Sequence, residues 1–452
     1  MVAALLVGAS GGCRRETVAS APSGGRQAVE AGTARCDSAL PAAGAAQLPV
    51  LHRRDQQDSD NFVTTAAAFR GDARVGPAAW WVRPDTMGGT VKFAGPDRLV
   101  IAGQSGAASW TVGGVSVRNP ADRWARASSG ELPVAGSFVE VPAPVVVGTT
   151  VVTSVPQQVR HGDTTQTVAV VCGIDAANGH VRWGTQVPFP TTGSDESVTL
   201  LATGGAVVVV FGQGADLVGL TAATGQMRWH ATVGVPATVT ASGGLLVLSP
   251  VYAEESRSLA ETRALDLGDG HVAWRHPMPT SANPIEHRTV VATAAGQPVV
   301  VQETVDSANG TTRDAKVQLI AYGADGSVRW KQASDPTGRI DAVDDLLIET
   351  VDRTESAPQQ TTTRRVADGA AVWRARLNQS LGDVAASGTR LFLAAGDLRS
   401  LVVVDRHGGA VATSLAGVMM NLGKSGIPPD LTVADQTLMV TVGGTAVGFG
   451  LR

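Results

Sequence analysis

The sequence predicts an all-β protein assembled from repeated small antiparallel sheets. Three observations lead to this fold class. A short phrase that ends in Trp recurs along the 452-residue chain. Short apolar runs rich in Val and Leu precede the copies and are typical of strands. Gly, Val and Thr are abundant while long Leu/Glu/Lys runs are missing, which disfavours a helical bundle.

The repeated phrase has the form Asp-x-x-x-Gly-x-x-x-Trp. Its clearest copies are residues 175–183 and 221–229. The final positions lie 40 to 59 residues apart, end with Thr413, and are otherwise Trp80, Trp124, Trp183, Trp229, Trp274, Trp330 and Trp373. Pro120 replaces the phrase glycine before Trp124, and the glycines of the other copies are Gly76, Gly179, Gly225, Gly270, Gly326, Gly369 and Gly409. Chance is a poor explanation for eight such units.

Each part of the repeat has a physical reading. The Asp-x-x-x-Gly segment predicts a tight hairpin turn, because Asp bonds the turn backbone and Gly adopts the left-handed conformation at low cost. Runs such as 206–211, 245–248, 297–302 and 391–394 predict the preceding strands. The Trp then fills the gap between neighbouring sheets, where its burial stabilises by roughly 4–6 kcal/mol before entropy is subtracted.

Closing the array into a ring leaves only short exposed edges. The C-terminal run 436–451 reads as a hairpin with no Trp phrase after it, and the first phrase, 72–80, has no complete hairpin before it. We therefore expect an N-terminal strand, with 62–69 as a candidate, to complete the C-terminal sheet. The prediction is an eight-bladed β-propeller of four-stranded antiparallel blades over residues 61–452, with seven blades as the alternative.

The phrase Asp-Ala-x-x-Gly-x-x-x-Trp resembles the repeat of pyrroloquinoline-quinone-like (PQQ-like) β-propellers over residues 62–452. In that family, dehydrogenases mark their cofactor site with two adjacent cysteines, a Ca²⁺ held by Glu, Asn and Asp, and an Asp base. No two of the three cysteines here are adjacent, and no C-x-x-C-H haem motif occurs. We therefore expect the non-catalytic lipoprotein branch, with no catalytic residue, cofactor or metal. The alternative is a small-ligand-binding or quinoprotein-type dehydrogenase propeller that uses the central channel.

The N-terminus predicts an exported lipoprotein. Residues 1–13 hold a short apolar run that ends at Cys13, too short to span a bilayer. They resemble a lipobox, in which Cys13 would carry the lipid, although Ser10 stands where Leu or Val is usual. Residues 14–60, rich in Ala, Gly, Ser and Pro, predict a flexible tether, with a docking peptide as the alternative. We expect anchoring to the outer face of the cell membrane, or secretion as the alternative.

The cysteine count supports export. If Cys13 is lipidated, Cys36 and Cys172 remain as a pair that an oxidising compartment would bridge. Such a disulfide would fasten the N-terminal segment to the propeller. The alternative is two unrelated thiols.

Other candidate chemistry is weak. Gly423-Lys424-Ser425 lacks the first glycine of a phosphate-binding loop, and His180 and His271 are expected to be solvated turn residues. The acidic residues Asp341, Asp344 and Asp345 indicate a loop or protected edge, with a Ca²⁺ site as the lesser alternative. The net charge of −4 without clustered Lys/Arg indicates no nucleic-acid partner.

The function expected from these patterns is a protein-interaction scaffold or sensor at the cell envelope. Its partners would be envelope or secreted proteins, and the chain itself is expected to be a monomer. The widest spacings between the final positions of successive phrases predict longer loops. We expect a binding face among the loops Val155–Gln166, Ser281–Glu286 and Thr304–Asp314.

Overall fold

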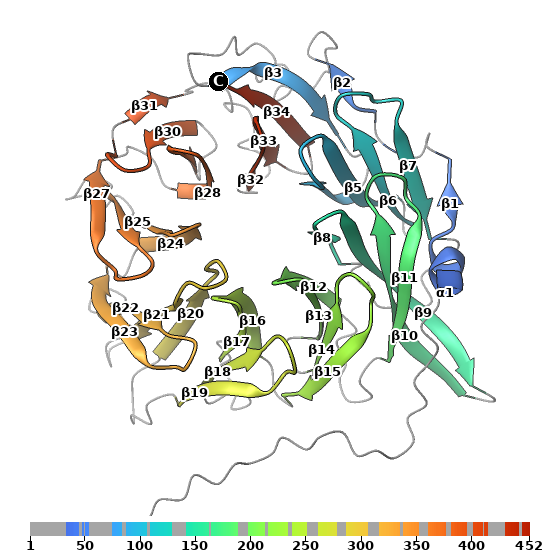
Figure 1. The fold of residues 1–452 in the computed structure, drawn as a ribbon, viewed down its shortest axis with the longest axis horizontal. Helices are drawn as coiled ribbons and strands as arrows, with labels where there is room; N and C mark the ends of the chain where they lie inside the picture. The colour runs from blue at the N-terminus through green and yellow to red at the C-terminus, as the bar shows by residue number, and fades with distance from the viewer. Residues whose placement is uncertain are drawn as a thin grey trace, which may run out of the picture.

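The computed structural model shows an all-β ring of eight sheets around a central axis, which confirms the predicted eight-bladed propeller (Figure 1). The structure describes residues 33–44, 48, 50–53, 75–83, 87–105, 109–128, 142–161, 164–188, 198–212, 216–233, 237–250, 261–277, 286–305, 316–334, 338–351, 360–376, 381–395, 401–409, 411–414, 430–442 and 445–452. No helix in these ranges is long and apolar enough to cross a membrane.

Each blade is an antiparallel sheet, and in blades 1 to 7 the strands run from the channel to the outer wall in chain order. Blade 1 contains β4 (Met87–Phe93), β5 (Arg98–Ser105), β6 (Ser109–Ser116) and β7 (Arg123–Ala127), and blade 2 contains β8 (Val145–Val147), β9 (Thr150–His161), β10 (Thr164–Asp175) and β11 (Val181–Pro188). Blade 3 contains β12 (Val198–Thr203), β13 (Ala206–Phe211), β14 (Asp216–Thr221) and β15 (Met227–Thr232), and blade 4 contains β16 (Ala237–Ser242), β17 (Leu245–Pro250), β18 (Glu261–Asp266) and β19 (Val272–Pro277).

The other four blades complete the ring. Blade 5 contains β20 (Glu286–Val291), β21 (Val299–Val305), β22 (Lys316–Tyr322) and β23 (Val328–Ser334), and blade 6 contains β24 (Gly338–Val343), β25 (Leu346–Val351), β26 (Gln360–Arg365) and β27 (Ala371–Ala375). Blade 7 contains β28 (Leu381–Ser387), β29 (Arg390–Ala395), β30 (Leu401–Asp405) and β31 (Val411–Ser414), and blade 8 contains β32 (Asp430–Ala434), β33 (Thr437–Val442), β34 (Thr445–Leu451) and β3 (Val75–Val82).

Strand β3 closes the ring as the outer strand of blade 8. It pairs antiparallel with β34, and Trp80 lies opposite Gly448. An N-terminal strand thus completes the C-terminal sheet, as predicted, but the strand carries the first Trp itself, and the candidate segment 62–69 lies outside the described residues. The prediction of a turn at Gly76 is wrong: because β3 does not follow its neighbour in the chain, no hairpin is needed there, and Gly76 lies within the strand.

Part of the predicted tether is folded. Helix α1 (Thr33–Ala39), β1 (Ala42–Ala43) and β2 (His52–Arg53) form a strap along the outside of blades 2, 1 and 8 (Figure 1). Strand β1 pairs with β7 and β2 pairs with β3, so two sheets gain a fifth strand. The prediction of a flexible tether over 14–60 is therefore wrong for these elements, because the edges of blades 1 and 8 supply the backbone partners that an isolated Ala/Pro-rich segment lacks.

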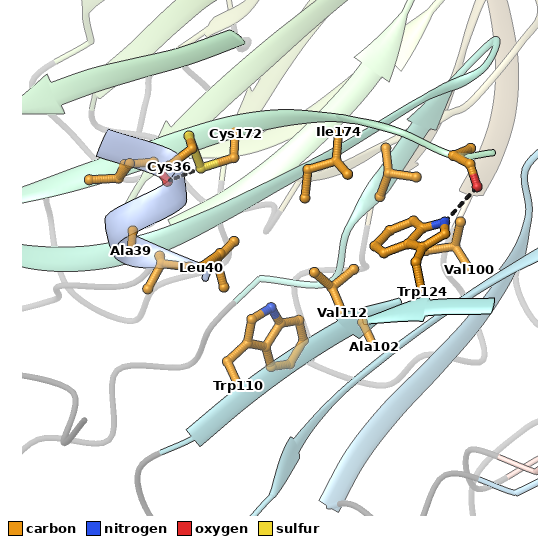
Figure 2. Close-up of a cluster of buried hydrophobic side chains, with 14 of the residues drawn as sticks. Cys36, Ala39, Leu40, Val100, Ala102, Trp110, Val112, Trp124, Cys172 and Ile174 are labelled. Carbon is orange, nitrogen blue, oxygen red and sulfur yellow. Dashed lines mark hydrogen bonds between the residues drawn. A yellow bond between two sulfur atoms is a disulfide. The ribbon is translucent and has the colours of Figure 1, made fainter. Parts of the chain in front are cut away.

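The core lies between blades. Strand β13 is buried along its whole length, since its two faces pack against different neighbouring sheets. Figure 2 shows the cluster where blades 1 and 2 meet the strap, with Leu40 of the strap against Trp110 and Val112 of β6. Each blade therefore depends on its neighbours to keep its apolar faces dry.

Candidate functional site

The repeat tryptophans join each blade to the next. All seven are buried, between 1% and 9% exposed. Five of them donate the indole Nε1–H to a backbone carbonyl in the Asp-x-x-x-Gly turn of the following blade, at 2.8–2.9 Å: Trp124 to Ala176, Trp183 to Ala222, Trp229 to Leu267, Trp330 to Val366 and Trp373 to Arg406. The indole thus contributes both apolar area and a directed bond across the blade interface.

Two features of the turns require glycine, a positive φ and a close contact with a Trp. Six of the seven predicted ones have positive φ between 65° and 78°: Gly179, Gly225, Gly270, Gly326, Gly369 and Gly409. Each also lies against the Trp of the preceding blade, where a Cβ would come within 3 Å of the indole side chain. A second set of glycines was missed by the sequence analysis: Gly173, Gly219 and Gly448 pair with Trp183, Trp229 and Trp80 of the same sheet, and a Cβ there would stand 2.1–2.2 Å from the indole.

Blade 5 breaks the pattern. Its turn is one residue shorter, with Gly326 N–H donating to Gly323 O in place of the five-residue turns elsewhere. Trp274 of blade 4 consequently finds no acceptor, and its buried Nε1 has no partner among the described residues. Trp274 instead packs against Tyr322 and His276, whose rings stack on each other at 4.3 Å.

A buried ion pair lies next to this aromatic group. Arg288 of β20 and Glu303 of β21 are joined at 2.8 Å, and both side chains are less than 10% exposed. Arg288 also donates to His276 O, and Gln318 donates to Glu303. Burial and the Arg288 charge lower the pKa of His276, against the opposing bond to Gly326 O, while burial raises the pKa of Tyr322. The group is a polar link between blades 4 and 5.

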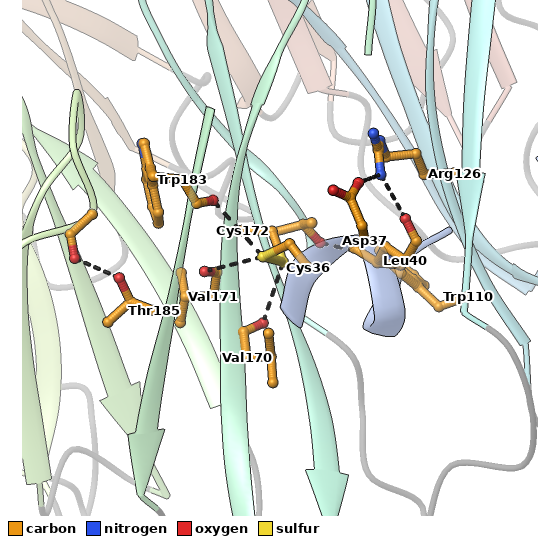
Figure 3. Close-up of a disulfide and its surroundings, with 12 residues drawn as sticks. Cys36, Asp37, Leu40, Trp110, Arg126, Val170, Val171, Cys172, Trp183 and Thr185 are labelled. Carbon is orange, nitrogen blue, oxygen red and sulfur yellow. Dashed lines mark hydrogen bonds and ion pairs between the residues drawn. A yellow bond between two sulfur atoms is a disulfide. The ribbon is translucent and has the colours of Figure 1, made fainter. Parts of the chain in front are cut away.

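Cys36 and Cys172 form a disulfide with an S–S distance of 2.11 Å and a Cα–Cα distance of 5.8 Å. It joins α1 of the strap to β10 of blade 2, and both residues are fully buried (Figure 3). Next to it, Arg126 of β7 bonds Asp37 and Leu40 O of the strap and Gly179 O of blade 2. The strap is thus fixed by one covalent bond and by a polar side chain from a neighbouring blade.

The channel carries charges on the inner strands of blades 6, 7, 8 and 1. Asp341 on β24, Asp383 on β28 and Asp430 on β32 lie on consecutive inner strands, and Lys92 lies on β4. Burial and the charges of Asp430 and Asp341 raise the pKa of Asp383 to about 6, against the bond from Leu431 N–H at 2.5 Å. Burial also raises the pKa of Asp341, offset by Arg339, and lowers the pKa of Lys92, offset by Asp430.

The three acidic residues singled out from the sequence do not form one cluster. Asp344 and Asp345 both bind Arg406 of the next blade, whereas Asp341 binds Arg339 in the channel. Within the described part of the chain, no group of three His, Cys, Asp or Glu side chains has a metal-binding arrangement. His180 and His271 lie exposed in separate turns.

The outer wall shows a charge pattern that sequence reasoning missed. The outer strands of blades 3 to 6 expose basic side chains and hold no acidic residue. We call this set the basic edge: Arg228 and His230 on β15, Arg275 on β19, Arg329 and Lys331 on β23, Arg374 on β27 and Arg376 directly after it. These residues come from different repeats, so they form no run in the sequence.

Of the three predicted binding loops, Val155–Gln166 is mainly a long hairpin, in which β9 and β10 pair from Thr164↔His161 inward. Residues 281–285 and 306–314 lie outside the described residues, while Glu286 belongs to β20 and Thr304 to β21. Cys13 also lies outside the described residues.

The fold and the Trp-anchored repeat define a β-propeller of the PQQ-like class. A family model described as outer membrane protein assembly factor BamB matches residues 70–356, more than half of the chain. The chain therefore belongs to this family of PQQ-like β-propellers. No curated protein matches the sequence.

Several solved structures resemble the chain at low sequence identity. BamB from Moraxella catarrhalis is 15% identical with a TM-score of 0.45, over 83% of this chain and 97% of that one. The dihydro-heme d1 dehydrogenase NirN is 14% identical with a TM-score of 0.48, over 76% and 68%. The quinohemoprotein alcohol dehydrogenase from Comamonas testosteroni is 11% identical with a TM-score of 0.43, over 80% and 75%. At this level of similarity they assign neither activity nor partner to this chain.

Proposed function

We propose that the chain is an exported, non-enzymatic protein-interaction scaffold or sensor, held to the outer face of the cell membrane by a lipid on Cys13. The observation that carries export is the Cys36–Cys172 disulfide, because such bonds form and persist in oxidising compartments. Membership of the family described as outer membrane protein assembly factor BamB supports a role with protein partners at the envelope.

The non-enzymatic part of the proposal rests on the cysteines. Dehydrogenases among the PQQ-like β-propellers use two adjacent cysteines beside the quinone, and no two cysteines are adjacent in this sequence. Cys36 and Cys172 are committed to fastening the strap to blade 2. Thermal unfolding with pyrroloquinoline quinone and Ca²⁺ checks this point: the melting temperature should stay unchanged, whereas a ligand that binds the native state must raise it.

Fractionation of cells tests the anchor. The full chain should sediment with membranes and be digested by protease added to intact spheroplasts, while Cys13→Ala should move to the soluble exported fraction. Thiol alkylation under denaturing conditions should find Cys36 and Cys172 blocked in both forms. Unchanged fractionation of Cys13→Ala would refute lipidation, and free thiols at both positions would refute export.

A further inference from the structure

The outer wall of the ring is divided into two halves. On blades 8 and 1 the outer strands β3 and β7 are covered by the strap strands β2 and β1. On blades 3 to 6 the outer strands β15, β19, β23 and β27 are the last members of their sheets, and no described strand pairs with them. Their backbone groups form a template for another strand.

The strap demonstrates how such an edge is used in this ring. It pairs antiparallel, with Ala42 opposite Arg126 and His52 opposite Trp81, and Ala127 N–H donates to Pro41 O at 3.2 Å. An extended segment can therefore reach the outer strand of a blade and add to it without disturbing the Trp contacts of the interior.

Side chains on the free edges specify what such a segment must carry. Cross-strand neighbours share one face of a sheet, with their Cβ atoms about 5 Å apart. The register of β23 places Lys331 opposite Ile320 and Val328 opposite Tyr322, so a basic and an apolar side chain share one face, two pairing positions apart. His230 and Met227 share one face of β15 in the same way. Met227 and Val328 are 45% and 52% exposed.

We propose that the basic edge binds an extended segment of a partner protein that carries acidic and apolar residues two positions apart on one face, by adding it as a fifth strand. This deepens the proposed function, because it rests on the chain having a protein partner. Its acidic residues would pair with the basic edge, and its apolar residues would cover Met227 or Val328. Basic side chains also protect an edge against aggregation, and the experiment below separates the two roles. Within the basic edge, His230 lies 3.2 Å from Asp216 and Arg275 lies 3.8 Å from Glu261, so an incoming acidic residue would compete with these contacts.

The curvature of the wall favours a peptide over a membrane. The four strands lie along a convex arc of about half the ring (Figure 1). A flat lipid surface touches such an arc over a short stretch, whereas a single extended segment needs only one strand edge. Four edges of similar character also allow several segments to bind one ring.

Binding of a labelled peptide of about ten residues with the repeat Glu-Glu-Val-Val, which puts Glu and Val two positions apart on each face, tests the proposal, using fluorescence anisotropy and the purified full chain. A peptide with Lys in place of Glu, and one with two interior Val replaced by Pro, are the controls for charge and for strand formation. We expect both controls to bind at least about tenfold more weakly, and the affinity of the Glu/Val peptide to fall as salt rises. Equal binding of the Pro peptide would overturn strand addition.

Variants locate the site. Combined reversal of Arg228, Arg275, Lys331 and Arg374 to Glu should weaken binding of the Glu/Val peptide at least about tenfold. Arg118→Glu, an exposed reversal on blade 1, should leave binding unchanged. A milder variant with Gln at the same four positions keeps the test valid if the reversal fails to fold. Binding to phosphatidylglycerol vesicles in place of the peptide would overturn the proposal in favour of a membrane surface, and neither result depends on the fractionation of Cys13→Ala.

Discussion

Gly179 in the turn of blade 2 lies directly against the indole of Trp124 in blade 1. A Cβ at position 179 would stand 2.6 Å from Trp124 Cδ2, well inside the contact distance of two carbon atoms. The same turn accepts the Trp124 Nε1–H through Ala176 O. One tight turn therefore supplies both the space and the acceptor for the tryptophan of its neighbour, and this pairing recurs around the ring.

Replacing Gly179 by Ala should destabilise the propeller by about 2–5 kcal/mol. The positive φ of 74° costs about 1–2 kcal/mol for a residue with a Cβ, and the clash with Trp124 adds about 1–3 kcal/mol of overpacking. Gly296→Ala is the matched control, since Gly296 also has positive φ, 83°, but a Cβ there would meet no atom within 4 Å. Urea unfolding should separate the two variants; equal losses would mean that the Trp contact carries no weight.

The short turn of blade 5 gives a prediction about hydrogen bonding. Trp330→Phe removes the donor to Val366 O, whereas Trp274→Phe removes an Nε1 that has no partner among the described residues. Both changes lose similar apolar area. Trp330→Phe should therefore cost about 1 kcal/mol more in the free energy of unfolding than Trp274→Phe. A smaller loss for Trp330→Phe in chemical denaturation would contradict this assignment.

The ring was predictable because its signal is local. Turn, glycine and Trp lie within nine residues of one another, and eight repetitions make the blade count readable. Gly173 and Gly219 each stand ten residues before a repeat Trp, so their spacing is visible in the sequence. The reason for glycine at these positions is that a Cβ would collide with the indole on the paired strand, and the turn pattern alone does not predict that contact.

The strap and the basic edge were not predictable in the same way. Ala42 and Ala43 become a strand only because β7 offers an unpaired edge, so their structure depends on a partner more than 80 residues away. The members of the basic edge are likewise brought together by the stacking of blades, and in sequence they occur singly or in pairs separated by one residue. Properties that arise from packing between repeats leave no local pattern.

Removing the disulfide should loosen the strap and lower stability. The Cys36→Ala/Cys172→Ala double variant should lose about 2–5 kcal/mol in the free energy of unfolding, because the bond closes a loop between residues 136 positions apart. Cys13→Ala is the control and should unfold at the same denaturant concentration as the original chain. Limited proteolysis should cut the double variant faster within 33–53; unchanged stability and cleavage would show that the remaining contacts, including Arg126 with Asp37, hold the strap alone.

The channel carboxylate Asp383 should make stability depend on pH. Its pKa is raised to about 6 by burial and by Asp430 and Asp341, so the folded state holds a proton that the unfolded chain releases near the ordinary value of 3.8. Stability from this group is complete below about pH 4 and declines as pH rises towards 6. Asp383→Asn keeps an acceptor for Leu431 N–H and removes the charge, so its free energy of unfolding should exceed that of the original chain by on the order of 1–3 kcal/mol at pH 7 and match it near pH 4.

Asp430→Asn should remove part of the same pH dependence of stability, while Arg339 and Lys92 stay in place as the nearby cations. Melting curves between pH 4 and 8 measure the difference, and parallel profiles for Asp383→Asn and the original chain would show that Asp383 ionises as freely in the channel as in water.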